Sequence, residues 1–206
     1  MAKYFDVHPH DPQARRIGQA TQILRDGGLI AYPTESGYAL GCSLDNPTGK
    51  ERISRIRQLD SHHHFTLVCH DFAQIGQLVH IDNRVFRAVK AADAGHYTFI
   101  LPATGAVPRR LLQPKKKTVG IRIAAHPVSC ALLADLGDPI LSSTLILPGE
   151  HNPMTDGWAV KEELDHQVDV VIDSGECGDE PTTVIDWSGE VPEVIRVGSG
   201  DPTPFE

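Results

Sequence analysis

Apolar residues recur along this chain at helical spacing in several segments. The first segment places Ile17, Ala20 and Leu24 on one side; it begins after an Asp-Pro pair and ends at a Gly-Gly pair. A capping aspartate at the start and glycine at the end are typical helix boundaries. The same reasoning predicts further helices at residues 46–59, 82–89, 127–136 and 155–164.

Shorter apolar runs predict strands between these helices, at residues 29–32, 65–69, 97–101, 118–123, 139–147, 168–172, 182–187 and 192–197. Pro33 is expected to stop the first strand, because proline has no N–H to donate. Helices and strands interleave without a strict βαβ alternation, which predicts an α/β protein with a mixed sheet flanked by helices. No repeat or linker divides the chain, so we predict one domain over residues 1–206, with its core at about 14–200.

Composition narrows the class of protein. The chain has a net charge of -8, which disfavours a general nucleic-acid binder, although local basic clusters can still bind phosphate. The four cysteines lie far apart and are expected to be reduced thiols rather than a disulfide framework. Residues 1–20 contain no apolar run, and no stretch approaches the roughly 20 apolar residues of a membrane span. We therefore expect a cytoplasmic protein without a membrane partner.

The segment from Tyr32 to Cys42 is the first candidate site. A buried strand runs there into a turn rich in hydroxyl groups and glycine. Such hydroxyls and exposed backbone N–H groups can receive carboxylate or phosphate oxygens. A turn with a purely structural role is the alternative interpretation.

Arginines in the second predicted helix form another candidate. Arg52, Arg55 and Arg57 share a helix face only in part. The planar fork of a guanidinium suits phosphate, because it donates two parallel hydrogen bonds. A solvated helix face is the alternative.

A basic segment precedes the strand at residues 118–123, and it contains Arg109, Arg110, Lys115, Lys116 and Lys117. Taken alone, such a run is a solvated loop more often than a site. Inside the strand the pattern is different, since an arginine at position 122 interrupts an apolar sequence. A buried arginine is costly unless it is paired or binds an anion, so we take it as a candidate site residue.

Two polar clusters remain. Ser142, Ser143 and Thr144 end an apolar strand, where their hydroxyls either contact a ligand or cap the turn. The His62-His63-His64 tract resembles a metal-binding sequence, but no second ligand cluster accompanies it. Adjacent histidines on a loop rarely face one ion together, so no metal site is predicted.

Four blocks of sequence resemble the YrdC family, and they occur in the family's order across nearly the whole chain. They are Tyr32-Pro-Thr-Glu35 with Gly41-Cys42, Gly95-His-Tyr-Thr98, Val119-Gly-Ile-Arg122 with His126-Pro127, and Pro181-Thr-Thr-Val-Ile-Asp186. Three segments look most like the YciO branch: Tyr32–Cys42, Arg55-Ile-Arg-Gln-Leu59 and Pro108-Arg-Arg-Leu-Leu112.

The resemblance implies a YrdC/RibB-type fold, a twisted mixed α/β sheet with a positively charged concave face. The family includes threonylcarbamoyl-adenylate synthases, which condense threonine, bicarbonate and ATP and release pyrophosphate. Their product feeds the threonylcarbamoyladenosine modification of tRNA. Family members are also described as binding double-stranded RNA.

The resemblance also assigns site residues. The substrate end of the pocket is implied at Thr34, Tyr38, Thr98 and Arg122. The nucleotide end is implied at Arg57, Ser142, Thr144, Thr182 and Arg196. This chain differs from the synthases where they carry Lys-x-Arg and Ser-x-Asn, because Leu59 and Ile146 replace the final residue of each motif.

Two functions are therefore predicted. One is a YciO-type protein that binds double-stranded RNA and/or a nucleotide, with RNA contacts at Arg52, Arg55, Arg109, Arg110, Lys115, Lys116 and Lys117. The alternative is an active synthase, a nucleotidyltransferase that uses threonine, bicarbonate and ATP with Mg²⁺. Expected partners are RNA or tRNA, ATP or AMP, and threonine, with no covalently bound cofactor. No residue is assigned a catalytic role, because positioning and charge neutralisation can carry such chemistry.

Overall fold

The computed structural model describes residues 1–60, 63–92 and 95–206. The α-helices are α1 (Ala14–Arg25), α2 (Gly49–Arg57), α3 (Phe72–Leu78), α4 (Asn83–Ala91), α5 (Pro127–Leu136) and α6 (Gly157–Leu164). The strands are β1 (Lys3–Asp6), β2 (Leu29–Thr34), β3 (Gly37–Ser43), β4 (Thr66–Cys69), β5 (Tyr97–Pro102), β6 (Thr118–Ile123), β7 (Ile140–Thr144), β8 (Val170–Asp173), β9 (Thr183–Asp186) and β10 (Glu193–Arg196). Two 3-10 turns, η1 (Arg109–Leu111) and η2 (Thr203–Phe205), complete the described elements.

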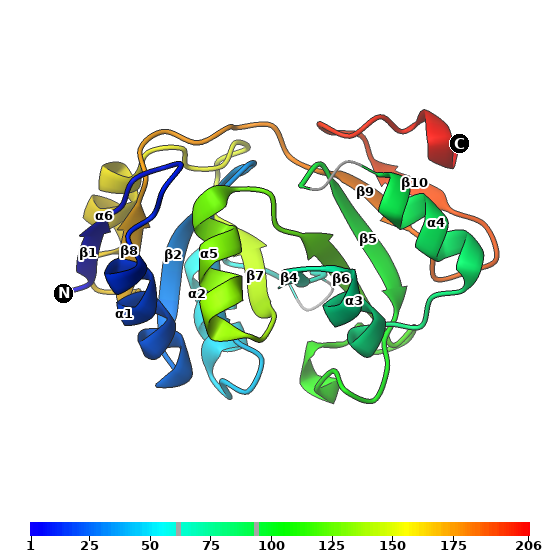
Figure 1. Ribbon diagram of the computed structural model, residues 1–206, viewed down its shortest axis with the longest axis horizontal. Coiled ribbons are helices and arrows are strands. Elements are labelled where there is room, and N and C mark those ends of the chain that lie inside the picture. The colour runs from blue at the N-terminus through cyan, green and yellow to red at the C-terminus, as the bar shows by residue number, and fades with distance from the viewer. Residues whose placement is uncertain (61–62, 93–94) are drawn as a thin grey trace.

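All of these strands join one ten-stranded sheet in the order β1-β8-β2-β3-β7-β4-β6-β5-β9-β10 (Figure 1). The sheet is mixed, as predicted: β2 pairs with β3 in an antiparallel hairpin, whereas β4 pairs with β6 and β5 pairs with β9 in parallel. The result is a single-domain twisted sheet flanked by helices.

Each face of the sheet packs into its own apolar cluster. One cluster joins α2, α3, α4 and α6 to alternate strand residues such as Leu40, Leu67 and Ile121. The other joins α1 and α5 to the opposite residues, including Ile30 and Val170. Figure 1 shows α1 and α5 side by side over the β8 and β2 end of the sheet. Helices α1 and α5 therefore cover only part of their face of the sheet and leave it open over β4, β6 and β5.

Helix boundaries follow from the local sequence. The Asp82 carboxylate accepts hydrogen bonds from the backbone N–H groups of Arg84 and Val85, which satisfies donors that the helix leaves unpaired. Pro127 occupies the first turn of α5, and Gly137 ends this helix in the left-handed region with φ 78°.

The expected stop at Pro33 is wrong. Strand β2 continues through Thr34, and Pro33 pairs with Tyr38 of β3 in the hairpin register. Position 33 therefore lies inside the β2–β3 pairing, where its carbonyl still accepts a hydrogen bond from the Ser129 hydroxyl at 2.7 Å. The glycine- and hydroxyl-rich segment after it is strand β3 rather than an extended turn.

Other boundaries also differ from the prediction. Helix α3 and strand β1 were not predicted, and β7 ends at Thr144 instead of residue 147. Phe5 and Phe205 are buried in the two clusters, so the core extends beyond residues 14–200.

The thiols of all four cysteines are free, and two of them, Cys42 and Cys69, are buried. Burial raises the pKa of each of these two thiols to about 12, so both stay protonated at neutral pH. Among the described residues, no helix has the length and apolar character needed to cross a membrane.

Candidate functional site

A cavity of about 300 Å³ lies over the part of the sheet that α1 and α5 leave open. Because successive side chains of a strand point to opposite faces of the sheet, only alternate residues line the cavity. In β6, Val119 and Ile121 pack in the apolar core, whereas Arg122 faces the cavity. Thr66 and Val68 of β4 and Thr98 of β5 reach the cavity in the same way. We refer to this cavity as the central pocket.

One wall of the central pocket is an ion pair. Arg122 Nη2 lies 2.7 Å from Glu35 Oε1, and their side chains are only 8% and 17% exposed. Arg122 also donates to the Ser36 hydroxyl at 3.0 Å, and Glu35 Oε2 accepts from the backbone N–H of His126 at 3.2 Å. The sequence analysis predicted that a buried Arg122 needs a paired carboxylate or a bound anion, and in the structure Glu35 is its partner.

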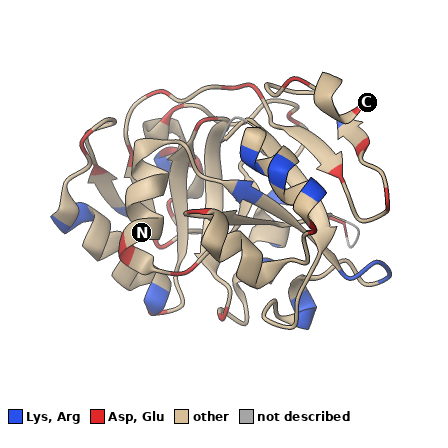
Figure 2. Ribbon diagram, turned by 45° about the vertical axis from the view of Figure 1, so that its right-hand side comes forward, with Lys and Arg blue, Asp and Glu red and all other residues tan. Residues whose placement is uncertain are grey.

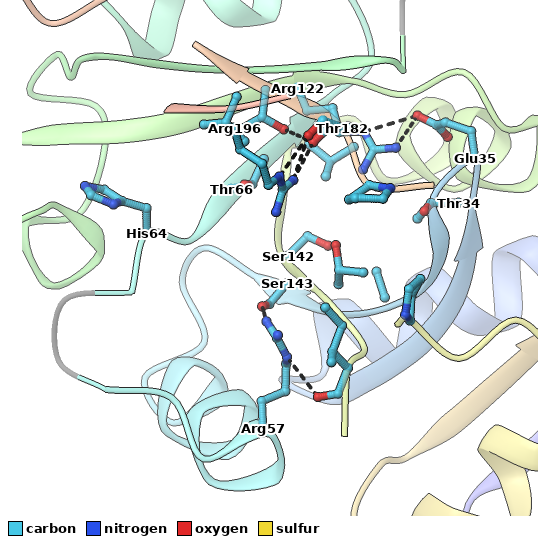
Figure 3. A pocket seen from close by; sticks show the side chains of 18 of the residues that line it. Thr34, Glu35, Arg57, His64, Thr66, Arg122, Ser142, Ser143, Thr182 and Arg196 are labelled. Carbon is cyan, nitrogen blue, oxygen red and sulfur yellow. Dashed lines mark hydrogen bonds and ion pairs between the residues drawn. The ribbon is translucent and has the colours of Figure 1, made fainter. Parts of the chain in front are cut away.

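Arg196 stands on the same side of the pocket (Figure 3). Its guanidinium donates to the Thr182 carbonyl at 3.0 and 2.8 Å and to the Thr182 hydroxyl at 3.2 Å. The Thr182 hydroxyl in turn lies 2.9 Å from the Thr98 hydroxyl. Burial and the nearby charge of Arg122 lower the pKa of Arg196.

Arg57 occupies the opposite side of the pocket, at the end of α2 (Figure 3). Its Nη1 donates to the Ser143 hydroxyl at 2.5 Å and its Nε to the Ile146 carbonyl at 3.3 Å. Burial lowers the pKa of Arg57 to about 10, which leaves it charged at neutral pH. Within the described part of the chain, neither Arg57 nor Arg196 forms an ion pair, so both charges are held by neutral oxygens.

Hydroxyl groups line the space between the two cationic sides. The Ser142 hydroxyl lies 2.7 Å from the Tyr32 hydroxyl, and Ser143 lies between Arg57 and His63 Nε2, which is 3.3 Å away. Burial, reinforced by Arg57, lowers the pKa of His63 to about 4. At neutral pH this ring is therefore neutral and available for hydrogen bonding.

The depressed pKa of His63 predicts an acid-sensitive stability. An unfolded histidine titrates near pH 6.5, so between about pH 6.5 and 4 the unfolded state binds more protons and stability falls as pH falls. When the pH falls from about 7.5 to 5, the free energy of unfolding should decrease by about 1–2 kcal/mol less in His63→Gln than in the wild type. Urea unfolding at both pH values measures this difference. The groups that act on His63 are Arg57, Asp60 and His64.

The control is His80→Gln, at an exposed position. Burial also lowers the pKa of His126, but this residue is present in all three proteins and adds the same acid sensitivity to each. Equal acid sensitivity of the wild type and His63→Gln would contradict the burial of this ring.

Most of the residues predicted for the pocket do meet there. The central pocket is lined by Thr34, Arg57, Thr98, Arg122, Ser142, Thr144, Thr182 and Arg196, among others. Tyr38 is the exception. Its hydroxyl donates to Asp173 at 3.1 Å and to the Gly175 carbonyl at 3.0 Å, on the opposite face of the sheet. Because Tyr38 pairs with Pro33 in the hairpin, it cannot share a face with Thr34.

The residues predicted to contact RNA have different surroundings in the structure. Arg52 pairs with Asp169 at 2.8 Å, near the β8 end of the sheet, and Lys116 pairs with Asp186 at 3.1 Å. Arg55 and Lys115 are exposed. Figure 2 shows basic positions scattered over several elements and interspersed with acidic ones.

Two pocket residues, Glu35 and Thr66, were not predicted as site residues from the sequence. Glu35 was quoted only within a motif and Thr66 only within a strand, whereas for Ser143 a ligand contact was one of two alternatives. The expectation that a buried arginine needs an anion or a paired carboxylate was the signal that could have found Glu35. Leu59 packs against the apolar core outside the pocket, while Ile146 lines the pocket and its carbonyl accepts a hydrogen bond from Arg57.

His62 lies outside the described residues, and among those described no group of three or more metal-ligating side chains occurs.

Fold and pocket together define a class: a single-domain α/β protein whose mixed sheet carries a pocket lined by arginines and hydroxyls. Comparison with known proteins gives the family. The Sua5/YciO/YrdC family model, described as telomere recombination, matches residues 22–198. The chain belongs to this family.

Similar proteins fall into two groups. The YciO protein of Escherichia coli (strain K12) is 48% identical over 205 residues, which is 100% of both chains, and its crystal structure superposes with a TM-score of 0.97. A threonylcarbamoyl-AMP synthase of Vibrio vulnificus is 31% identical over 187 residues, covering 88% of this chain and 98% of that protein. The structure of P. abyssi Sua5 complexed with L-threonine matches at a TM-score of 0.85 and 27% identity, over 95% of this chain and 57% of that one.

Proposed function

We propose that the central pocket binds a nucleotide. The observation that carries this proposal is the position of Arg57, a half-buried cation that faces the cavity opposite Arg122 and Arg196 and that, among the described residues, hydrogen-bonds to neutral oxygens. Partial burial of a charge without a counter-ion is costly, and a phosphate group between the two sides would remove much of that cost. The guanidinium forks and the pocket hydroxyls supply the donors that phosphate oxygens need.

The other end of the pocket suits a small polar substrate. Arg122 is already neutralised by Glu35, so this end offers hydrogen bonds rather than a free charge. Thr34 and Thr98 add hydroxyls there. The relative that was solved with L-threonine supports an amino acid of this size as the ligand.

Calorimetric titration of AMP and ATP tests the proposal. We expect both nucleotides to bind, and we expect Arg57→Gln to weaken binding by about 10-fold or more, because a hydrogen bond to a charged group contributes about 1.5–3 kcal/mol. Arg55→Gln is the matched control, since it removes the same charge from the exposed side of the same helix. Absence of nucleotide binding to the wild type, or equal affinities for Arg57→Gln and wild type, would refute the proposal.

A synthase reaction is the second candidate. It is favoured by the 31% identity to a threonylcarbamoyl-AMP synthase, and it would use threonine, bicarbonate and ATP carrying Mg²⁺. Pyrophosphate release that requires threonine and exceeds an enzyme-free control distinguishes turnover from simple binding. The apolar side chain of Ile146 in the pocket wall favours binding without turnover over the synthase.

Double-stranded RNA remains an alternative ligand for the basic residues outside the pocket. Phosphate contacts would make RNA affinity fall steeply with salt. The pairing of Arg52 and Lys116 with acidic side chains leaves fewer cations for such contacts. The nucleotide is therefore the ligand that this geometry favours.

A further inference from the structure

Strand β10 forms one end of the sheet, and β9 is its partner among the described strands (Figure 1). An edge strand presents unpaired backbone N–H and C=O groups to another chain. Around this strand Val191, Ile195 and Val197 are 70%, 52% and 62% exposed, and they are three of the five exposed large apolar residues in the described part of the chain. We call residues 191–197 the edge segment. Its clustered apolar side chains indicate a protein–protein contact.

A bulge in β10 places two opposite charges on one face of the sheet. Glu193 pairs with Asp186 and Arg196 pairs with Val184, so Ile195 is an extra residue in the register. Asp186 and Val184 are two positions apart in β9 and therefore share a face, and Val184 lines the central pocket. Glu193 and Arg196 consequently share the pocket face, although residues three apart in a regular strand lie on opposite faces.

Neither of these two charges forms an ion pair with a described residue of its own chain. Glu193 lies opposite another carboxylate, Asp186, which itself pairs with Lys116 at 3.1 Å. Like charges directly opposite each other on neighbouring strands are destabilising. Arg196 hydrogen-bonds to neutral oxygens and lies in the field of a second cation, Arg122. The edge segment therefore presents one unpaired acid and one unpaired base.

We propose that two copies of this chain associate through their edge segments, as antiparallel β10 strands related by a two-fold axis between Val194 and Ile195. In this register Glu193 lies opposite Arg196 of the partner subunit, and the symmetry forms the same pair twice. Cβ atoms directly opposite each other in an antiparallel pair are about 4.5–5.5 Å apart, which suits an ion pair. The edge segment is thus complementary in charge to a second copy of itself. This inference is independent of the ligand that the pocket binds.

Apolar residues complete the proposed contact. Pro192 lies opposite Val197 of the partner subunit, so the exposed valine gains an apolar neighbour. The bulge interrupts the hydrogen-bond ladder, and the charges and apolar side chains therefore select the partner more than a long ladder does. A two-fold axis perpendicular to the sheet keeps both central pockets on the same face of the dimer. Each pocket then has a carboxylate of the other subunit beside Arg196.

Sedimentation velocity of charge-reversal variants, in the absence of any nucleotide, tests the proposal. The wild type should dimerise with a Kd in the micromolar range, since a single edge strand is a small interface. Glu193→Arg and Arg196→Glu should each raise this Kd at least about 10-fold, because each variant places like charges opposite each other twice. An equimolar mixture of the two variants should dimerise again, since a heterodimer restores both pairs of opposite charge.

Arg15→Glu and Glu162→Arg are the matched controls, because they reverse the same charges at exposed positions of α1 and α6. Each control alone, and their mixture, should dimerise like the wild type. Ile195→Lys is a second test in case Arg196→Glu folds poorly. It keeps both charges of the edge segment but places a lysine at an apolar contact, so it should abolish the dimer while circular dichroism shows a folded chain.

Four results would overturn the inference. A wild type that stays monomeric at submillimolar concentration rejects the contact. A dimer that persists in both Glu193→Arg and Ile195→Lys assigns the association to another surface. Folded charge-reversal variants whose mixture remains monomeric reject the proposed register. Species larger than a dimer indicate open-ended strand addition instead of a closed two-fold pair.

Discussion

Replacing Glu35 by alanine is expected to lower the free energy of unfolding by about 3–5 kcal/mol, the typical cost of removing one partner from a buried ion pair. The reason is that Arg122, only 8% exposed, keeps its charge and loses its counter-ion at 2.7 Å. The backbone N–H of His126 loses its acceptor at the same time. Urea unfolding followed by circular dichroism measures the effect.

A double-mutant cycle identifies the cause. Glu35→Ala/Arg122→Met should recover much of the loss, because the second change removes the unpaired charge. Lys116→Met is the control, since it breaks an ion pair whose lysine is 57% exposed and should change stability by less than about 1 kcal/mol. A Glu35→Ala protein as stable as this control would show that solvent in the pocket already screens Arg122.

Gly95→Ala is expected to destabilise the protein by about 3 kcal/mol, combining backbone strain with damage to the same ion pair. Gly95 has φ +89°, and a Cβ placed there would lie 2.5 Å from Glu35 Oε1 and 2.7 Å from the Ala125 Cβ. The added methyl group therefore pushes Glu35 away from Arg122. Urea unfolding gives the loss, and nucleotide titration shows whether the pocket is disturbed with it.

Gly137→Ala separates the two contributions. This glycine also has a positive φ, +78°, but no atom lies within 4 Å of the position a Cβ would take. Its substitution should cost about 1–2 kcal/mol, the strain of the left-handed backbone alone. If Gly95→Ala and Gly137→Ala cost the same, the contact with Glu35 is unimportant.

Local patterns in the sequence predicted the elements that local interactions determine. Helix α5 was predicted from Pro127 to Leu136, because a proline at its first turn and a glycine after its last mark both ends. Strand β6 was predicted from its apolar run, and Arg122 stood out as the one charge within it. The mixed sheet also followed from the order of the elements.

Features that depend on distant pairing could not be predicted. Thr34 and Tyr38 are close in sequence and both were placed at the pocket, yet the hairpin register sends them to opposite faces. A shift of one residue in that register would place both side chains on the same face of the sheet. Arg122 and Glu35 meet only after β6 and the β2–β3 hairpin have joined the same sheet.

The grouping of the arginines of helix α2 also depends on distant partners. Helix α2 turns its arginines in different directions, so that Arg57 reaches Ser143 in the pocket while Arg52 reaches Asp169 at 2.8 Å. A count of charges along the sequence treats these residues as one group. Their partners lie far away in the sequence and hold the two arginines at different places in the structure.

The open half of the sheet has an evolutionary consequence. Alternate residues of β4, β5 and β6 belong to the apolar core, and four of the residues between them, Thr66, Val68, Thr98 and Arg122, line the floor of the pocket. Substitutions in the floor can therefore change ligand chemistry while the neighbouring core residues keep the fold. Relatives that share this sheet can diverge in activity one floor position at a time, so a common fold among them is compatible with different reactions.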